Sequence, residues 1–333
     1  MPEKRLKPAI AGLLVAASLP PWGWWPLTFV GLAMFTSAEF AATTRRGKFL
    51  TGFVFGVGWF LPSLSWMWFL TAPGYVIAAA LFAAFHGIAA MVAPRGRWRV
   101  VGLPAAHVIA EAVRFCFPFG GVPLARLAIG QAAGPFVGVS RVGGALLLSW
   151  FVLQVGVALS EVAPRVFGII RRRSTVREVP VHAGASLAVA LLAWVASPLA
   201  AGDLGIDTDG TGHTIRVAVV QGGGPQGTHA IHTDPRKVVE RHLAATSTIE
   251  PGSVDLVVWP ENVIDVADFA SSVELQEVTA EASRIGAPFA VGITEDTTDG
   301  NHFLNAQVLV TPQGEIAARY EKVRRVPFGE YMP

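Results

Sequence analysis

The sequence predicts a multi-pass α-helical membrane bundle followed by an α/β domain. Composition is the first reason: of 333 residues, 52% are hydrophobic and 15% are charged, and the mean hydropathy is +0.48. Soluble globular proteins carry about 25% charged residues, so most of this chain is too apolar for a soluble fold. Low charge, abundant glycine and proline, and a single cysteine also exclude a disordered chain, a coiled coil and a disulfide scaffold.

The charge distribution is the second reason. Residues 1–200 contain 17 Lys+Arg and 5 Asp+Glu, a net charge of +12, whereas residues 201–333 contain 9 and 19, a net charge of −10. A basic, apolar segment is thus joined to an acidic, more polar one, which indicates two domains. We predict a membrane domain over 1–200, a Gly/Asp-rich linker over 201–212 and an α/β domain over 213–333.

Long apolar stretches divide the first 200 residues. About 20 apolar residues are needed to cross the hydrocarbon layer of a membrane. The seven candidate spans are 8–20, 26–43, 49–71, 74–93, 100–117, 133–162 and 181–200. The first is short and follows basic residues, as a signal peptide does, but the next apolar run begins directly after PPWGWWP. We therefore predict that the first span is retained.

The connections between these spans predict the orientation. Basic residues occur at the N-terminus and in the second, fourth and sixth connections, whereas the first and third connections have none. The basic residues are Lys4, Arg5 and Lys7; Arg45, Arg46 and Lys48; Arg95, Arg97 and Arg99; and Arg165, Arg171, Arg172, Arg173 and Arg177. Such residues favour the cytoplasmic side. We therefore predict a cytoplasmic N-terminus and, after seven crossings, an extracytoplasmic domain at 201–333.

Several polar residues lie within or beside the spans. Glu111 and Arg114 are three residues apart, so they can pair on one helix face, although ionisable groups at membrane depth are often functional. We predict the pair. His86 and His107 are expected to be packed, hydrogen-bonded core residues, because no metal-binding spacing surrounds them. Cys116 is expected to pack as a small apolar residue. The outer segment 117–131 fits either a re-entrant arm or a plain loop.

Past the linker, the hydrophobic pattern changes to that of an α/β domain. The predicted strands are 214–221, 255–260 and 288–293, followed by a hairpin of 303–311 and 314–322, and the predicted helices run from Asp234 to Thr248 and from Ser271 to Gly286. This order predicts parallel strands with helical crossovers and then an antiparallel hairpin. The chain ends directly after the hairpin, so the sheet would keep an uncovered edge. We therefore expect that the C-terminal portion is missing.

Three charged residues in this domain could take part in chemistry. Glu261 follows the apolar run DLVVWP, where a strand ends and ligands bind in open α/β sheets, so it could act as a general base. Lys322 ends the hairpin, and Glu330 lies in the rigid loop PFGEYMP. Taken alone, each of the three also fits an ordinary solvated position.

Two further groups are weaker candidates. The glycines at 222–224 could bind an anion through backbone N–H groups, but a flexible turn is the better interpretation. His229 and His232 have no cysteine or carboxylate cluster that would complete a metal site. We predict no metal and no cofactor.

Taken together, the motifs resemble a known family. VAVVQGG, DLVVWPEN and YEKVRRVPFGEYMP resemble the strand, glutamate and lysine segments of the nitrilase superfamily. Seven preceding spans, the PPWGWWP turn and an outward-facing domain make the chain similar to the apolipoprotein N-acyltransferases. The resemblance implies a nitrilase-like α-β-β-α fold in the bacterial cytoplasmic membrane. It also implies transfer of an acyl chain from a membrane phospholipid to the N-terminal cysteine amine of diacylglyceryl lipoproteins, with no nucleic-acid partner.

In that family a Glu–Lys–Cys triad performs the transfer. By matching motifs, Glu261 resembles the general base, Lys322 the residue that stabilises the oxyanion, and Glu330 the additional glutamate of the PFGE loop. The nucleophilic cysteine of the family lies downstream of PFGE, and Cys116 does not match its motif. We therefore expect that the chain as written is inactive. The alternative is a non-catalytic membrane scaffold or binding protein; a transporter and an amidase for soluble substrates fit the two-part composition less well.

Overall fold

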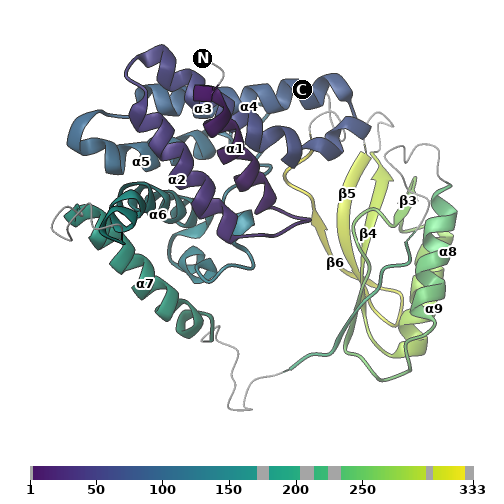
Figure 1. Ribbon diagram of the computed structural model, residues 1–333. Coiled ribbons are helices and arrows are strands. Elements are labelled where there is room, and N and C mark those ends of the chain that lie inside the picture. Colours follow the sequence, from purple (N-terminus) through teal and green to yellow (C-terminus); the bar gives the residue numbers. More distant parts are fainter. Residues whose placement is uncertain (1–2, 171–179, 203–213, 224–233, 298–302, 327–333) are drawn as a thin grey trace. The chain divides into compact units, whose positions relative to one another are not determined.

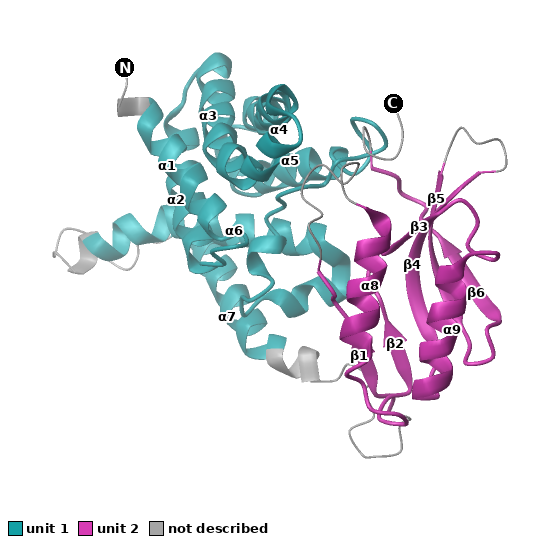
Figure 2. Cartoon of the chain, turned by 90° about the vertical axis from the view of Figure 1, so that its right-hand side faces the viewer, with its two compact units in different colours: residues 1–206 teal, residues 207–333 magenta. Residues whose placement is uncertain are grey.

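The computed structural model describes residues 3–170, 180–202, 214–223, 234–297 and 303–326 (Figure 1). The chain divides into two compact units, Met1–Ile206 and Asp207–Pro333, which have separate colours in Figure 2. The boundary between the units lies within the predicted linker.

The first unit is helical in each range where an apolar span is predicted. Its described helices are α1 Glu3–Ala17, α2 Pro26–Ala41, α3 Arg45–Ser63, α4 Ala72–Val92, α5 Arg99–Val113, α6 Ser140–Ile170 and α7 Val181–Gly202. Helix α3 ends near Pro62 and is followed by a 3-10 helix, Ser65–Phe69. Helix α6 is interrupted at Gly143 and Gly144, whose backbone angles are not helical.

Among the described residues, two helical segments are both long and apolar enough to cross a membrane. They are Ala72–Val92 and Val137–Phe167, while Pro26–Ala41 and Val181–Ser197 are apolar but shorter. The multi-pass arrangement of all seven helices stays a prediction.

Aromatic rings and small residues hold this unit together. The rings of Phe35 and Phe55 stack with centroids 4.1 Å apart, and those of Trp59 and Phe60 stack at 4.6 Å. Helices α3 and α4 pack closely because Gly56 has no side chain; a Cβ there would lie 2.5 Å from the Cα atom of Ala83.

The second unit is built on one mixed sheet. Its strands are β1 Val217–Val219, β2 Leu256–Val258, β3 Ile264–Val266, β4 Phe289–Asp296, β5 Phe303–Val310 and β6 Ile316–Glu321, with helices α8 Pro235–Thr246 and α9 Val273–Ile285 between them. The order is β1-β2-β4-β5-β6; β1, β2 and β4 are parallel, and β4, β5 and β6 are antiparallel. This confirms the predicted parallel strands and hairpin.

Strand β3 was not predicted. Its pairing with β4 leaves a short unpaired segment between β2 and β3. Both β2 and β3 pair in parallel with β4: Val257 lies opposite Phe289 near the start of β4, and Ile264 lies opposite Ile293 further along. The chain therefore leaves the sheet and rejoins it between β2 and β3.

Helices α8 and α9 cover one face of the sheet (Figures 1 and 2). The N-cap of α9 is Ser272, whose hydroxyl accepts from the backbone N–H of Leu275 at 3.1 Å. The predicted cap, Ser271, is one residue too early, and its hydroxyl donates to Asp268 at 2.5 Å instead. Gly286 ends α9 with φ +79°, as predicted.

The core of this unit lies between the helices and the sheet. Trp259 is fully buried there, and its Nε1 donates to the hydroxyl of Thr246 at 3.0 Å. The described residues form a single sheet with helices on one face, so the four-layer α-β-β-α arrangement stays an implication of the resemblance.

An ion pair joins the starts of β1 and β2. The backbone N–H of Arg216 donates to Asp255 at 2.7 Å, and the guanidinium donates at 3.1 and 3.3 Å. These hydrogen bonds from Arg216 hold the pKa of Asp255 below its ordinary value. The pair thereby helps to fix β2, which leads into the candidate site.

Candidate active site

Glu261 lies in the gap between β2 and β3. On one side of it the N–H of Trp259 donates to Ala290 at 2.8 Å, and on the other the N–H of Val263 donates to Gly292 at 3.1 Å. Between these bonds the neighbouring Asn262 has φ +58°, in the left-handed region. The chain therefore departs from β4 at Glu261, whose side chain is 56% exposed.

The gap requires glycine on the neighbouring strand. A Cβ atom on Gly292 would lie 2.3 Å from the carbonyl oxygen of Pro260 and 2.6 Å from the Cα atom of Glu261. No side chain fits at those distances without moving the backbone that carries Glu261.

We expect Gly292→Ala to destabilise this part of the sheet by about 1–3 kcal/mol, the usual cost of overpacking. The readout is hydrogen–deuterium exchange of the Trp259 and Val263 amides, which should accelerate. Gly184→Ala is the matched control, because a Cβ there meets nothing within 4 Å. Unchanged exchange at both amides in Gly292→Ala would show that the close approach is dispensable.

Two donors converge on the Glu261 carboxylate. Its Oε1 accepts from the Lys322 ammonium at 2.8 Å and from the Asn305 amide at 2.7 Å. Glu261 and Lys322 are 61 residues apart in the sequence, and the fold brings them together. Hydrogen bonds of this kind, in which one or both partners are charged, are stronger than neutral ones and fix the direction of the carboxylate.

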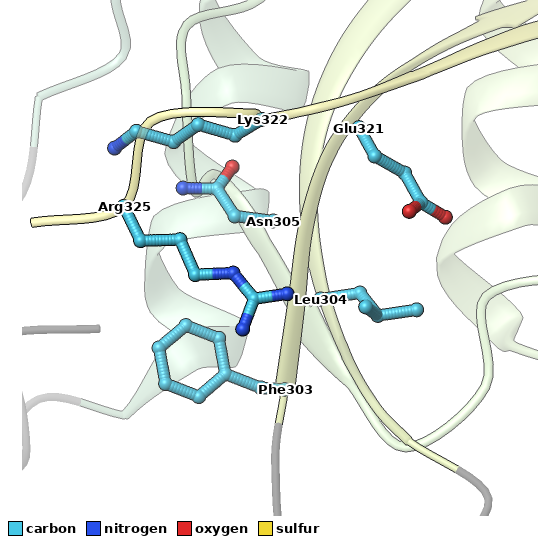
Figure 3. Close-up of a pocket in the computed structure, with 6 residues that line it drawn as sticks. All are labelled: Phe303, Leu304, Asn305, Glu321, Lys322 and Arg325. Atoms are coloured by element: carbon cyan, nitrogen blue, oxygen red, sulfur yellow. The ribbon is translucent and has the colours of Figure 1, made fainter. Parts of the chain in front are cut away.

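The β5–β6 hairpin positions both donors. The backbone N–H of Lys322, directly after β6, donates to the carbonyl of Asn305 in β5 at 2.8 Å. Side chains alternate along a strand. In Figure 3 those of Lys322 and Asn305 accordingly extend to one side, and those of Leu304 and Glu321 extend to the other.

A small pocket of about 20 Å³ lies beside these donors (Figure 3). Phe303 and Arg325 line it together with Asn305 and Lys322. The arrangement joins a carboxylate that can accept a proton to a cation that can stabilise developing negative charge.

Asn305 is the functional candidate that the sequence interpretation missed. In strand β5 the residues Ala306, Val308 and Val310 are buried, and Asn305 and Gln307 alternate with them. Two polar residues at spacing two within an apolar strand were the available signal, because they mark the face turned away from the core.

The other residues that the sequence suggested for a site are not found in contact with Glu261, Lys322 and Asn305 within the described ranges. Glu330 lies outside the described residues, as do His229 and His232. A Cβ atom on Gly222 would lie 2.6 Å from the backbone of α8. A glycine is therefore needed here because the chain after β1 passes close to that helix. Within the described ranges no cluster of three or more histidine, cysteine, aspartate or glutamate residues could hold a metal ion.

Cys116 belongs to the helical unit, and the prediction that it packs as a small apolar residue is wrong. It is exposed just beyond the end of α5, and its Sγ lies 3.3 Å from the carbonyl oxygen of Val113. It lies at a helix end in the other unit, and it does not match the motif of the family's nucleophilic cysteine.

The predicted pairing of Glu111 with Arg114 is wrong. No ion pair joins these buried residues: Glu111 accepts from the backbone N–H of Leu127 at 2.9 Å, and Arg114 donates to the carbonyl of Leu124. Both residues bind the backbone of the 117–131 segment, which folds back toward them. The prediction failed because helix spacing takes no account of this segment, whose backbone groups hydrogen-bond to both side chains.

The two core histidines are as predicted. His86 and His107 are both 1% exposed, and their Nδ1 atoms lie 2.8 Å apart, within hydrogen-bonding distance. They stack within the aromatic core of the helical unit.

Each of the two units matches a protein-family model. The model of the apolipoprotein N-acyltransferase N-terminal domain matches residues 11–158, and that of carbon-nitrogen hydrolases matches residues 216–333. Among solved structures, the crystal structure of an N-terminal amidase with an Asn-Glu-Ala peptide matches 32% of this chain and 28% of its own, at 14% identity and a TM-score of 0.26. The assignment therefore rests on sequence.

Curated relatives match nearly the whole chain. Apolipoprotein N-acyltransferase of Mycolicibacterium smegmatis is 30% identical over 97% of this chain and 57% of its own length, and that of Pseudomonas paraeruginosa is 28% identical over 97% and 63%. The chain thus spans about three fifths of the length of these relatives. With both domain models matched in order, the chain belongs to the apolipoprotein N-acyltransferase family of the nitrilase superfamily, as its motifs predict.

Proposed function

We propose that this protein moves a fatty acyl chain from a membrane phospholipid to the N-terminal cysteine amine of diacylglyceryl lipoproteins. The observation that carries the proposal is the contact of Glu261 with Lys322 in the carbon-nitrogen hydrolase domain. Family membership supports the reaction class, and the apolar helical unit supports lipid-anchored substrates.

The proposed chemistry proceeds in two steps. Glu261 takes the proton of a nucleophilic thiol, the sulfur attacks the phospholipid ester carbonyl, and the ester C–O bond breaks as the proton passes to the departing lysophospholipid oxygen. The lipoprotein amine then attacks the thioester, Glu261 takes a proton from the amine nitrogen, and that proton passes to the sulfur as the C–S bond breaks, which regenerates the thiol. Lys322 stabilises the oxyanion of each tetrahedral intermediate. Glu330 is proposed as an assisting glutamate.

We propose that the nucleophile is a cysteine at the position that the family resemblance implies for the third member of the triad. Cys116 is not proposed for this role, because it lies in the helical unit and does not match the motif. Acyl transfer is therefore to be assayed with the complete gene product, the whole polypeptide that the gene encodes.

The proposed setting is a bacterial cytoplasmic membrane, with the α/β unit outside. Alternating basic connections support this orientation, and so does the exposure of Trp22 and Trp24, 47% and 59%, in a connection that would lie at the outer interface. A site at the outer surface would meet both lipid-anchored substrates without extracting either from the bilayer.

Topology can be tested with fusions to alkaline phosphatase, which is active only outside the cytoplasm. A fusion after Ala201 should be active, and a fusion after Arg172 should be inactive, because the basic residues near Arg172 favour the cytoplasm. The reverse pattern would contradict the seven-span orientation.

Asn305→Leu should slow acyl transfer about tenfold or more, since a hydrogen bond to a charged group contributes about 1.5–3 kcal/mol. The loss should appear in kcat with KM nearly unchanged, because the amide directs Glu261 and need not contact substrate. Gln307→Leu is the matched control: Gln307 alternates with the same buried residues of β5 but donates to the carbonyl of Trp259 at 3.3 Å. Equal losses in the two variants would indicate a general effect on β5.

A further inference from the structure

Helices α5, α6 and α7 enclose a cleft that the proposed reaction does not use. Its volume is about 250 Å³, and most of its walls are apolar, among them Val101, Phe151 and Val189. The main polar contact within it is a hydrogen bond from the Gln154 amide to the Ser186 hydroxyl at 3.3 Å, which joins α6 to α7.

Charged groups lie at one end of this cleft. Glu161, seven residues or about 10 Å beyond Gln154 along α6, is 2.8 Å from His182 Nε2 and 3.6 Å from the Arg99 guanidinium. The carboxylate is 9% exposed, whereas the side chains of Arg99 and His182 are 41% and 46% exposed. A buried carboxylate thus orients two exposed nitrogen groups where the cleft meets the surface.

The surroundings of this end are positively charged. Arg95 and Arg97 precede Arg99, and Arg165 lies on α6 one turn after Glu161. Arg99 and Arg95 also interact electrostatically with Glu39, which forms an ion pair with Lys48. Near this end the described chain thus carries five basic residues, namely Arg95, Arg97, Arg99, Arg165 and Lys48, and two carboxylates, Glu161 and Glu39, an excess of three positive charges.

We propose that this cleft binds an anionic phospholipid of the cytoplasmic leaflet, with an acyl chain between the three helices and the headgroup phosphate at Arg99 and His182. An apolar slot that ends at the exposed Arg99 guanidinium and a hydrogen-bonding imidazole matches an anionic amphiphile. A partner helix would bury the Arg99 guanidinium against an apolar surface, which is costly. Assignment to the cytoplasmic leaflet rests on the proposed topology, and that leaflet carries the anionic lipids that attract basic residues.

This site is separate in role from the proposed acyl donor site, because basic residues place it on the opposite side of the membrane from the α/β unit. The lipid would fill the space between α5, α6 and α7 and hold α7, which leads to the linker. It is thus a retained structural lipid and not a substrate.

Lipid retention by the purified chain tests the proposal by native mass spectrometry, in mixtures of dioleoyl phosphatidylglycerol and dioleoyl phosphatidylcholine. We expect one phosphatidylglycerol to be retained in preference to phosphatidylcholine. Ala185→Trp, which fills the cleft, should remove this retention. Leu191→Trp, on another side of α7 and 58% exposed in the parent, should not.

The headgroup contact is tested in the same assay. Arg99→Gln should lower phosphatidylglycerol retention about fivefold, the effect of one basic residue near an anionic surface, and Arg99→Lys should restore it. Arg45→Gln, at an exposed arginine of another basic connection, should leave it unchanged. Equal retention of both lipids by the parent, or full retention by Ala185→Trp, would overturn the proposal. Neither readout requires acyl transfer, so failure here leaves the proposed reaction standing.

Discussion

Glu261→Gln is expected to reduce acyl transfer by the complete gene product about 10²–10⁴-fold, the usual loss when general-base assistance is removed. The glutamine keeps the shape of the side chain, and its oxygen can still accept from Lys322 and Asn305, but it cannot take a proton from a thiol. Folding should change little, because the side chain is 56% exposed. The measurement is the rate at which labelled acyl chain from phospholipid appears as an enzyme thioester.

Glu321→Gln is the matched control for this substitution. Glu321 is adjacent to Lys322 and 57% exposed, but its side chain extends to the opposite side of β6 (Figure 3). It should retain near-parental rates. A Glu261→Gln enzyme that keeps more than about a tenth of the parental rate would exclude Glu261 as the base.

Lys322→Met is expected to lower the same rate about 10²–10³-fold, because a charge aimed at the developing oxyanion is lost while the long apolar stem can still pack. Lys322→Arg is the sharper test. A planar guanidinium replaces a compact ammonium poorly at a single oxygen atom, so the rate should stay low although the charge is preserved.

Arg325→Met provides the comparison within the same pocket. Arg325 lines the pocket with Lys322 (Figure 3), so its loss removes a nearby charge without removing the contact to Glu261. The rate should fall far less than in Lys322→Met. Near-normal turnover of Lys322→Arg would instead make Lys322 a general cation and place the oxyanion donors on backbone N–H groups.

The sequence predicted helices and main strands because their signals are local. Apolar stretches marked the seven helices, and the change to short apolar runs marked β1, β2, β4 and the hairpin. Strand β3 has only three residues and depends on pairing with β4, which no local pattern encodes. The N-cap of α9 was misplaced by one residue because Ser271 and Ser272 are adjacent and only geometry distinguishes them.

The site was less accessible to local reasoning than the fold. Glu261 and Lys322 each fit an ordinary surface position, and only their resemblance to family motifs linked them across 61 residues. Gly292 gave no signal, because its role depends on the approach of Pro260 from the segment between β2 and β3. For Glu111 and Arg114, helix spacing suggested a local pair, whereas the donor to Glu111 and the acceptor of the Arg114 hydrogen bond lie on a returning segment outside the helix.

The most direct test of the proposed function is acyl transfer to a diacylated lipopeptide, measured by mass spectrometry of its N-terminal cysteine. The complete gene product, supplied with phospholipid that carries a labelled acyl chain, should place the label on the cysteine amine as an amide. Glu261→Gln and Lys322→Met should abolish this product, and Glu321→Gln should preserve it. Absence of labelled amide with the parent protein, or equal amounts with the parent and the two site variants, would contradict the account and favour a non-catalytic scaffold.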